Sequence, residues 1–197
     1  MNPILVIYGT TDGHTKKLAY FLSDALQQTG ARVDVVRAGK DAIDPDPNAY
    51  SGIVVAGSVH AGGYQRPLRR WVGAHAEALG HRPAVFLSVC LGVLQDDPAV
   101  AADLDRIMHR FFTQTGWHPA MTKTVAGALP YSRYGIVKRW VMRRMARKAG
   151  VETDPHQDYE YTDWDDLRLF ARGFSSSVRA AAPIPFKRPT QVAEATI

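Results

Sequence analysis

Short apolar runs alternate along the chain with longer segments of mixed polarity. The apolar runs are rich in β-branched residues and have the length of strands. Continuous apolar runs of this kind are typical of strands that are buried on both faces, as in a parallel sheet. Such runs predict strands at Ile4–Tyr8, Gly52–Gly57 and Ala84–Val89. With the more mixed segments Arg32–Val36 and Lys123–Ala128, the coarse pattern gives five strands.

The segments between the strands have helical periodicity, with apolar residues three or four positions apart. Gly30 is a stop signal for the first helix, and Pro67 and Pro98 stand at tolerated first-turn positions of the second and third. The predicted helices are His14–Thr29, Arg66–Leu79, Pro98–Thr115 and Thr162–Val178. Alternating strands and helices predict the α/β class, with a doubly wound, five-stranded parallel sheet.

The bulk properties fit one globular domain. With 197 residues and 46% hydrophobic content, the chain can bury a core without staples. We assign residues 1–178 to this domain and expect 179–197, rich in Ala and Pro, to be a disordered tail. A single cysteine excludes an internal disulfide and favours a reducing compartment. We expect neither a secretory signal nor a membrane-spanning run.

Three turns are expected to share one edge of the sheet. They are Gly9–Thr15, Ser58–Tyr64 and Cys90–Asp97. Right-handed crossovers bring the carboxyl ends of parallel strands to the same edge, where ligands bind at the topological switch point.

The first turn has the chemistry of a phosphate site. A strand, a hydroxyl-rich turn and a helix N-terminus offer free N–H groups at the positive end of a helix dipole. Thr10, Thr11 and Thr15 add hydroxyl donors, and Gly13 permits close approach. The turn has no Lys, which argues against a P-loop, and it is not a GxGxxG motif. It suits a monophosphate, usually flavin mononucleotide (FMN); the alternative is a plain capped turn.

The second turn could face a flat ligand. The adjacent glycines Gly62 and Gly63 allow unusual backbone angles, Tyr64 could stack on a ring, and His60 could hydrogen-bond at a ring edge. The alternative is a loop with a surface histidine. The third turn, Ser88–Leu94, is apolar for an exposed connection. An apolar ligand or burial under another loop would explain this, and Cys90 fits a small buried hydrophobe better than a reactive thiol.

A basic segment lies between the fifth strand and the last helix. Val137, Trp140, Val141 and Met145 form one helical stripe, but cationic residues project into the same arc. Long cationic side chains that snorkel from an interface suit an anionic membrane surface. A solvated helix and a nucleic-acid patch are alternatives, and the absence of a nucleic-acid motif disfavours the second. The candidate surface residues are Arg133, Lys138, Arg139, Trp140, Arg143, Arg144, Arg147 and Lys148.

The segment Thr162–Asp166 combines hydroxyl and acidic groups at the start of the last helix. Such groups stabilise the positive end of a helix, so capping explains them better than a metal site. We therefore expect no metal.

Three motifs in order carry a resemblance to a known family. They are Thr10 with Asp12, Gly13 and Thr15; Ala126–Leu129 with Arg133 and Tyr134; and Tyr161–Trp164. Over roughly Ile4 to Phe174 the chain resembles the flavodoxin-like proteins, and most closely their menaquinone-dependent protoporphyrinogen oxidase branch. The resemblance implies a flavodoxin-like sheet with the basic segment inserted before the last helix.

The resemblance also implies a noncovalent FMN. Its phosphate would bind Thr10, Thr11, Gly13, His14 and Thr15, while Asp12 would turn away from the phosphate and cap the helix. The ring would lie between two loops, against Ser58, Val59, His60, Gly63, Tyr64, Ser88, Val89, Cys90, Leu91 and Gly92.

The implied reaction oxidises protoporphyrinogen IX, with a membrane quinone as acceptor, in haem biosynthesis on the cytoplasmic face of the cell membrane. His60 is the candidate for handling protons, because histidine titrates near neutrality. The sequence leaves open whether the protein forms a homo-oligomer. Two other functions compete: a flavodoxin-type electron carrier and an NAD(P)H-dependent quinone reductase. Such carriers are usually acidic, so the net charge of +5 counts against the first.

Overall fold

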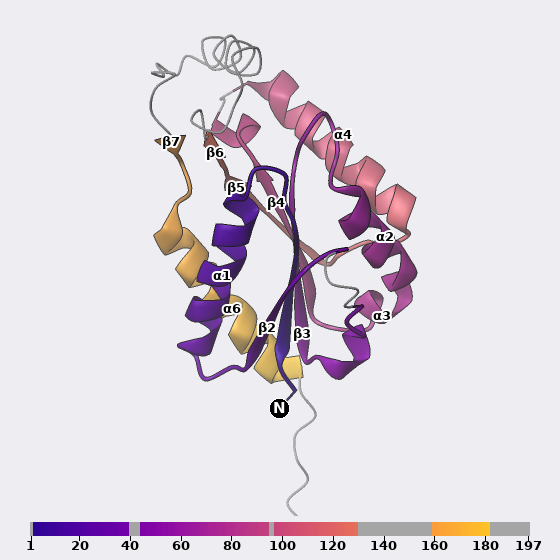
Figure 1. Cartoon of the computed structure of the whole chain (residues 1–197), viewed down its shortest axis with the longest axis vertical. Helices are drawn as coiled ribbons and strands as arrows, with labels where there is room; N and C mark the ends of the chain where they lie inside the picture. Colours follow the sequence, from indigo (N-terminus) through magenta and orange to yellow (C-terminus); the bar gives the residue numbers. More distant parts are fainter. Residues whose placement is uncertain (1, 40–43, 95–96, 130–158, 182–197) are drawn as a thin grey trace, which may run out of the picture.

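A parallel sheet forms the middle layer of the computed structural model, which describes residues 2–39, 44–94, 97–129 and 159–181 (Figure 1). The order in this sheet is β2–β1–β3–β4–β5. Its strands are β1 (Ile4–Gly9), β2 (Val33–Arg37), β3 (Gly52–Ser58), β4 (Ala84–Cys90) and β5 (Met121–Ala126). The predicted doubly wound α/β fold, with the flavodoxin-like strand order, is therefore confirmed.

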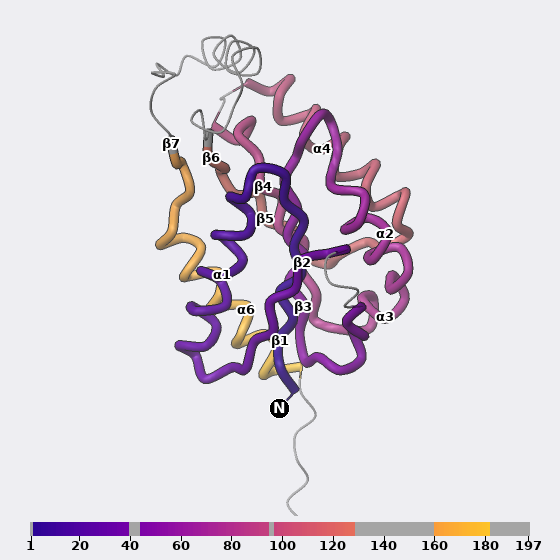
Figure 2. Tube along the Cα trace, in the orientation of Figure 1, coloured from indigo at the N-terminus to yellow at the C-terminus, as the bar shows by residue number. Residues whose placement is uncertain are grey.

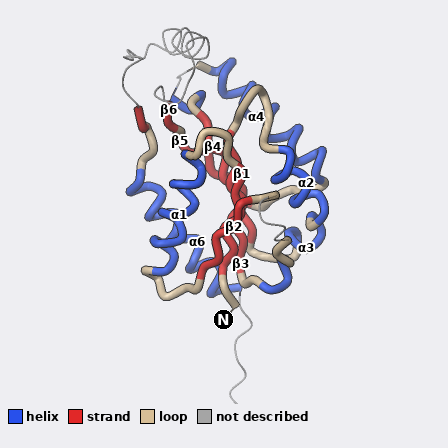
Figure 3. The backbone as a smooth tube through the Cα atoms, viewed as in Figure 1, coloured by secondary structure: helices blue, strands red, loops and turns tan. Residues whose placement is uncertain are grey.

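Helices cover both faces of the sheet (Figure 3). One face carries α1 (His14–Gln27) and α6 (Trp164–Ala181). The other carries α2 (Arg66–Ala74), α3 (Ala76–Gly80) and α4 (Pro98–Thr115). Two short 3-10 helices, η1 (Pro47–Ala49) and η2 (Gly92–Leu94), lie in connections. Among the described helices, none is long and apolar enough to cross a bilayer.

The central strand β1 supplies both halves of the core. Its side chains alternate between the two faces, as the period of a strand requires. Ile4, Val6 and Tyr8 pack under α1 and α6, whereas Leu5 and Ile7 pack under the opposite helices. β1 pairs in parallel with both β2 and β3, so the chain leaves it toward opposite halves of the sheet. This pairing makes the carboxyl end of β1 the topological switch point.

Several helix boundaries differ from the predictions; α1 ends at Gln27 rather than Thr29, and α6 begins at Trp164 rather than Thr162. The expected helix Arg66–Leu79 is interrupted at His75, whose φ of −118° and ψ of 16° are not helical. The His75 ring Nδ1 bonds the carbonyl of Trp71, so a side chain competes for a helical acceptor there. The last helix continues through Ala181, which makes residues 179–181 of the expected tail helical. Arg179 bonds the Thr29 carbonyl at 2.9 Å, and residues 182–197 lie outside the described chain.

A small ribbon that was not predicted forms a second, two-stranded sheet after β5. β6 (Ala128–Leu129) pairs antiparallel with β7 (Tyr159–Glu160). Residues 130–158, which contain all of the candidate surface residues of the basic segment, lie between these strands and outside the described residues. The ribbon therefore holds the two ends of that segment side by side.

Packing of α6 on β3 gives a stability test. A Cβ at Gly52 would lie 2.4 Å from Val178 Cγ2, so Gly52→Val should overpack this contact and lower the free energy of unfolding by about 1–3 kcal/mol. Gly173→Ala is the matched control, because a Cβ there meets nothing within 4 Å. It should raise stability by about 0.5–1 kcal/mol through helix propensity. Urea unfolding measures both, and equal effects of the two variants would contradict the packing argument.

Candidate flavin site

The carboxyl ends of the central strands converge, as predicted. The Val59 N–H donates to the Val89 carbonyl at 2.9 Å, and the Gly127 N–H donates to the Cys90 carbonyl at 3.1 Å. The turn from β1 into α1 lies at the same end of the molecule as β6 and β7 (Figure 2). The three turns and the ribbon therefore share one edge.

The first turn is closed by its own side chains. Gly13 precedes α1 with a φ of 93°, a left-handed conformation that favours glycine. Its N–H donates to Thr10 Oγ1 at 2.9 Å, so the Thr10 hydroxyl shapes the turn. In the first turn of α1, the N–H groups of His14, Thr15 and Lys16 have no intrahelical acceptor. They form a concentration of donors at the positive end of the helix dipole.

Thr15 is the strongest sign of an anion ligand. The residue is 1% exposed, and its hydroxyl has no hydrogen-bond partner within the described part of the chain. An unpaired buried hydroxyl costs about 1–3 kcal/mol. A phosphate oxygen at the helix N-terminus would satisfy this hydroxyl together with the free backbone donors. The residues present therefore fit a bound phosphomonoester.

Two residues of this turn behave differently from the prediction. Asp12 was expected to cap α1, but Gly13 is the N-cap residue and no side chain caps the helix there. The expectation that Asp12 caps α1 is wrong. The left-handed Gly13 occupies the N-cap position, and its N–H donates to the Thr10 hydroxyl. The His14 ring turns instead to Thr162, with Nε2 2.7 Å from Thr162 Oγ1. His14 can serve a phosphate through its backbone N–H.

A polar cluster joins α1 to the ribbon. Thr162 Oγ1 also donates to the Ala126 carbonyl at 2.7 Å, and Lys17 Nζ lies 2.6 Å from Glu160 Oε2. Trp164 Nε1 donates to Glu160 Oε1 at 2.8 Å, and Lys17 stands over the indole ring. The motif Tyr161–Trp164 thus supplies contacts that its sequence did not predict. The cluster fixes the phosphate turn against both ends of the inserted segment.

This cluster perturbs two pKa values. Burial lowers the pKa of His14 below its ordinary 6.5, with Glu160 opposing the shift and Lys17 adding to it. Burial would raise the pKa of Glu160, but hydrogen bonds from Lys17 and Trp164 outweigh burial and hold it below its usual range. At neutral pH, His14 is therefore neutral and Glu160 is ionised.

The His14 shift predicts acid sensitivity. Below pH 6.5 the unfolded chain protonates His14 while the native state resists, so stability falls as the pH drops from 6.5 toward the native pKa. His14→Gln can still hydrogen-bond Thr162 and does not titrate. We expect its unfolding free energy to depend less on pH between about 6.5 and 5 than that of the wild type. Parallel slopes in urea titrations of the two proteins would contradict this.

The second turn is a tight hairpin. His60 and Gly63 exchange two backbone hydrogen bonds, and Ala61 and Gly62 between them have φ values of 49° and 75°. Positive φ at both central positions is the signature of a type I′ turn. The His60 side chain is exposed on this hairpin. Its role in handling protons remains a prediction.

Tyr64 points away from the turn. Its ring packs edge-on against Phe86 and Phe111 at centroid distances of 5.0 Å, and its hydroxyl lies 2.7 Å from Ser88 Oγ. Burial raises the pKa of Tyr64 far above its ordinary value. Tyr64 is thus partly buried against the core, and its stacking on a ligand ring remains a prediction.

Ser88→Ala tests this buried pair. The change leaves the Tyr64 hydroxyl without its partner and should cost about 1–3 kcal/mol of unfolding free energy. The double variant Ser88→Ala with Tyr64→Phe removes both polar groups and should recover most of that loss. Chemical denaturation gives the unfolding free energies of Ser88→Ala, Tyr64→Phe and the double variant. Additive losses in the double variant would show that the hydrogen bond is not the source.

The third turn starts later than predicted. Ser88, Val89 and Cys90 are at most 6% exposed and belong to β4, so their side chains are buried; their contact with a ligand ring remains a prediction. Burial raises the pKa of the Cys90 thiol, which agrees with a buried hydrophobe rather than a reactive group. The half-buried residues Leu91 and Gly92 remain at the edge. Beyond them Val93 and Leu94, 42% and 38% exposed, present apolar surface there.

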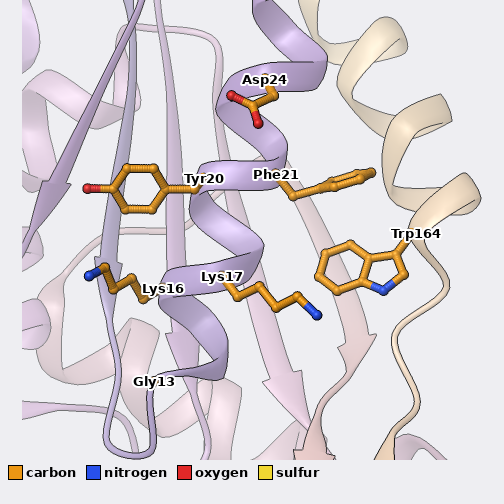
Figure 4. A pocket seen from close by; sticks show the side chains of 7 residues that line it. All are labelled: Gly13, Lys16, Lys17, Tyr20, Phe21, Asp24 and Trp164. Atoms are coloured by element: carbon orange, nitrogen blue, oxygen red, sulfur yellow. The ribbon is translucent and has the colours of Figure 1, made fainter.

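An open pocket of about 640 Å³ lies on the outer face of α1 (Figure 4). Lys16 and Tyr20 point to one side of the helix, and Phe21, with Lys17 and Trp164, to the other. The pocket meets the phosphate turn only at Gly13 and contains no residue of the other two turns. It is separate from the sheet edge. Within the described chain, no group of His, Cys, Asp and Glu could hold a metal ion.

Comparison with known proteins places this fold and site in a family. Residues 5–156 match the flavodoxin domain family. The chain is 29% identical to protoporphyrinogen IX dehydrogenase (quinone) of Escherichia coli strain K12, over 85% of this chain and 92% of that protein. It is 31% identical to the protein of the same name from Leishmania major, over 92% of this chain and 78% of that protein.

A solved structure agrees on the fold. Oxidised flavodoxin 1 from Bacillus cereus superposes with a TM-score of 0.53 at 13% identity, over 88% of this chain and 97% of that one. The chain therefore belongs to the flavodoxin domain family, in the branch that contains these two curated oxidoreductases.

Proposed function

We propose that this protein binds FMN and oxidises protoporphyrinogen IX to protoporphyrin IX, with a membrane quinone as electron acceptor. The observation that carries the cofactor assignment is the buried, unpartnered hydroxyl of Thr15 among the free N–H groups of α1. The substrate assignment is supported by the names of the two relatives, which the chain matches over most of its length.

The residues at the carboxyl edge of the sheet would have different roles. The first turn would hold the phosphate through backbone N–H groups and Thr15. Val93 and Leu94 would offer apolar surface to the ring side of the site and keep water from it. FMN, when bound, supplies the electron-transfer chemistry between substrate and quinone. His60, exposed on the second hairpin, is the candidate to exchange protons with solvent.

We further propose that the enzyme works at the cytoplasmic surface of the membrane. The basic, Trp-containing segment from Arg133 to Lys148 would bind anionic lipids there. The strands that flank residues 130–158, β6 and β7, pair with each other at the edge that carries the first turn. A lipid-bound segment would thus keep the site near a membrane-dissolved quinone.

A half-reaction separates this function from its competitors. The FMN-loaded protein is mixed anaerobically with protoporphyrinogen IX, and with NADH or NADPH in parallel, while flavin absorbance is followed. Bleaching by the porphyrinogen alone supports the proposal. Bleaching only by a nicotinamide would favour a quinone reductase, and bleaching by neither would favour an electron carrier; both results would overturn it.

A further inference from the structure

Gln65, the residue before α2, connects the first two turns of the site. Its Nε2 lies 3.1 Å from Thr11 Oγ1 in the first turn. The same nitrogen lies 2.8 Å from Ser58 Oγ and 3.1 Å from the Ser58 carbonyl, at the end of β3. A carboxamide carries two N–H donors, so it can donate to one acceptor in each turn at once.

The surroundings fix the direction of this amide. Exchanging its oxygen and nitrogen would place an acceptor against the Ser58 carbonyl, which is itself only an acceptor. Gln65 Oε1 is buried and has no partner within the described residues. A Cβ at Gly9 would lie 2.7 Å from that oxygen and 3.1 Å from Gln65 Cβ, so a larger residue at position 9 would shift the Gln65 side chain.

We propose that Gln65 is a positioning residue, which holds the phosphate turn in register with the turn after β3. Thr11 is exposed, and a turn held at that point keeps its N–H groups oriented before the ligand arrives. The inference rests on the proposed FMN function. It adds that phosphate affinity depends on a residue that touches neither the phosphate nor the flavin ring.

Comparison of FMN with riboflavin tests the role, because riboflavin has the same ring and no phosphate. Gln65→Met keeps the length of the side chain and removes the amide. Isothermal titration should show FMN affinity about tenfold weaker, the factor expected for one or two lost hydrogen bonds. Riboflavin affinity should change much less, so the FMN-to-riboflavin affinity ratio should fall.

Two further variants make the test specific. Gln114 is exposed on α4, and its amide oxygen accepts a hydrogen bond from Arg69. Gln114→Met removes that amide and should leave the FMN and riboflavin affinities unchanged. Thr11→Val removes the same contact from the solvent side. Because the resemblance also makes Thr11 a phosphate ligand, the informative measurement is the double variant of Gln65→Met with Thr11→Val, which should lower the ratio hardly further than Thr11→Val alone.

The outcomes are distinct. Equal losses for FMN and riboflavin in Gln65→Met, or no loss in either, would overturn the positioning role alone. A wild-type protein that binds neither flavin would overturn the proposed function and this inference together.

Discussion

Removing the Thr15 hydroxyl should weaken FMN binding by about 10- to 100-fold. The hydroxyl is buried and unpaired in the described structure, and a hydrogen bond to a charged phosphate is worth about 1.5–3 kcal/mol. Thr15→Val keeps the shape of the side chain, and its apo form should be as stable as the wild type or more so. Flavin fluorescence titration and thermal unfolding measure the two effects.

The control for Thr15 is the same substitution at an exposed position. Thr113→Val on α4 lies far along the chain from the turn and should leave FMN affinity unchanged. A Thr15→Val protein that binds FMN like the wild type would mean that the hydroxyl does not face the phosphate.

Neutralising the basic segment should abolish binding to anionic membranes. Changing Arg139, Arg143, Arg144 and Arg147 to Gln removes four cationic groups, each worth about 1 kcal/mol near an anionic surface. Together they correspond to an affinity loss of roughly a thousandfold. Sedimentation with phosphatidylglycerol vesicles at physiological salt measures the bound fraction.

A second quadruple variant separates local charge from net charge. Changing Arg66, Arg70, Arg106 and Arg110 to Gln alters the net charge equally, but on exposed positions of α2 and α4. This protein should pellet with the vesicles like the wild type. Equal losses in both variants would show that the basic segment is not the membrane contact.

The layered fold was predictable because its signals are local. Helix α4 has the predicted bounds, Pro98–Thr115, because Asp97 caps its start and a left-handed Gly116 ends it. The central strands β1, β3 and β4 show in the sequence because burial on both faces leaves a continuous apolar run, whereas the outer strands β2 and β5 are only partly buried. The strands β6 and β7 have two residues each, too few for any periodicity to appear.

The site was predictable in its turns and less so in its side chains. The hydroxyl-rich turn and its shared edge follow from the strand–turn–helix pattern. The partner of His14 is 148 positions away, and no local pattern reports such a pair. The packing of Tyr64 against the core did not show in the sequence, because a tyrosine in a glycine-rich turn can face solvent or core. The hydrogen bond of its hydroxyl with Ser88, 24 positions away, holds the ring toward the core.

Quinone-dependent porphyrin formation tests the central claim most directly. The FMN-loaded protein is incubated anaerobically with protoporphyrinogen IX and a menaquinone analogue, and porphyrin fluorescence is followed against reactions without protein, FMN or quinone. We expect porphyrin to form only when all three are present, and Thr15→Val to need more FMN for the same rate. A fully flavin-loaded protein that leaves the porphyrinogen unoxidised would contradict the account.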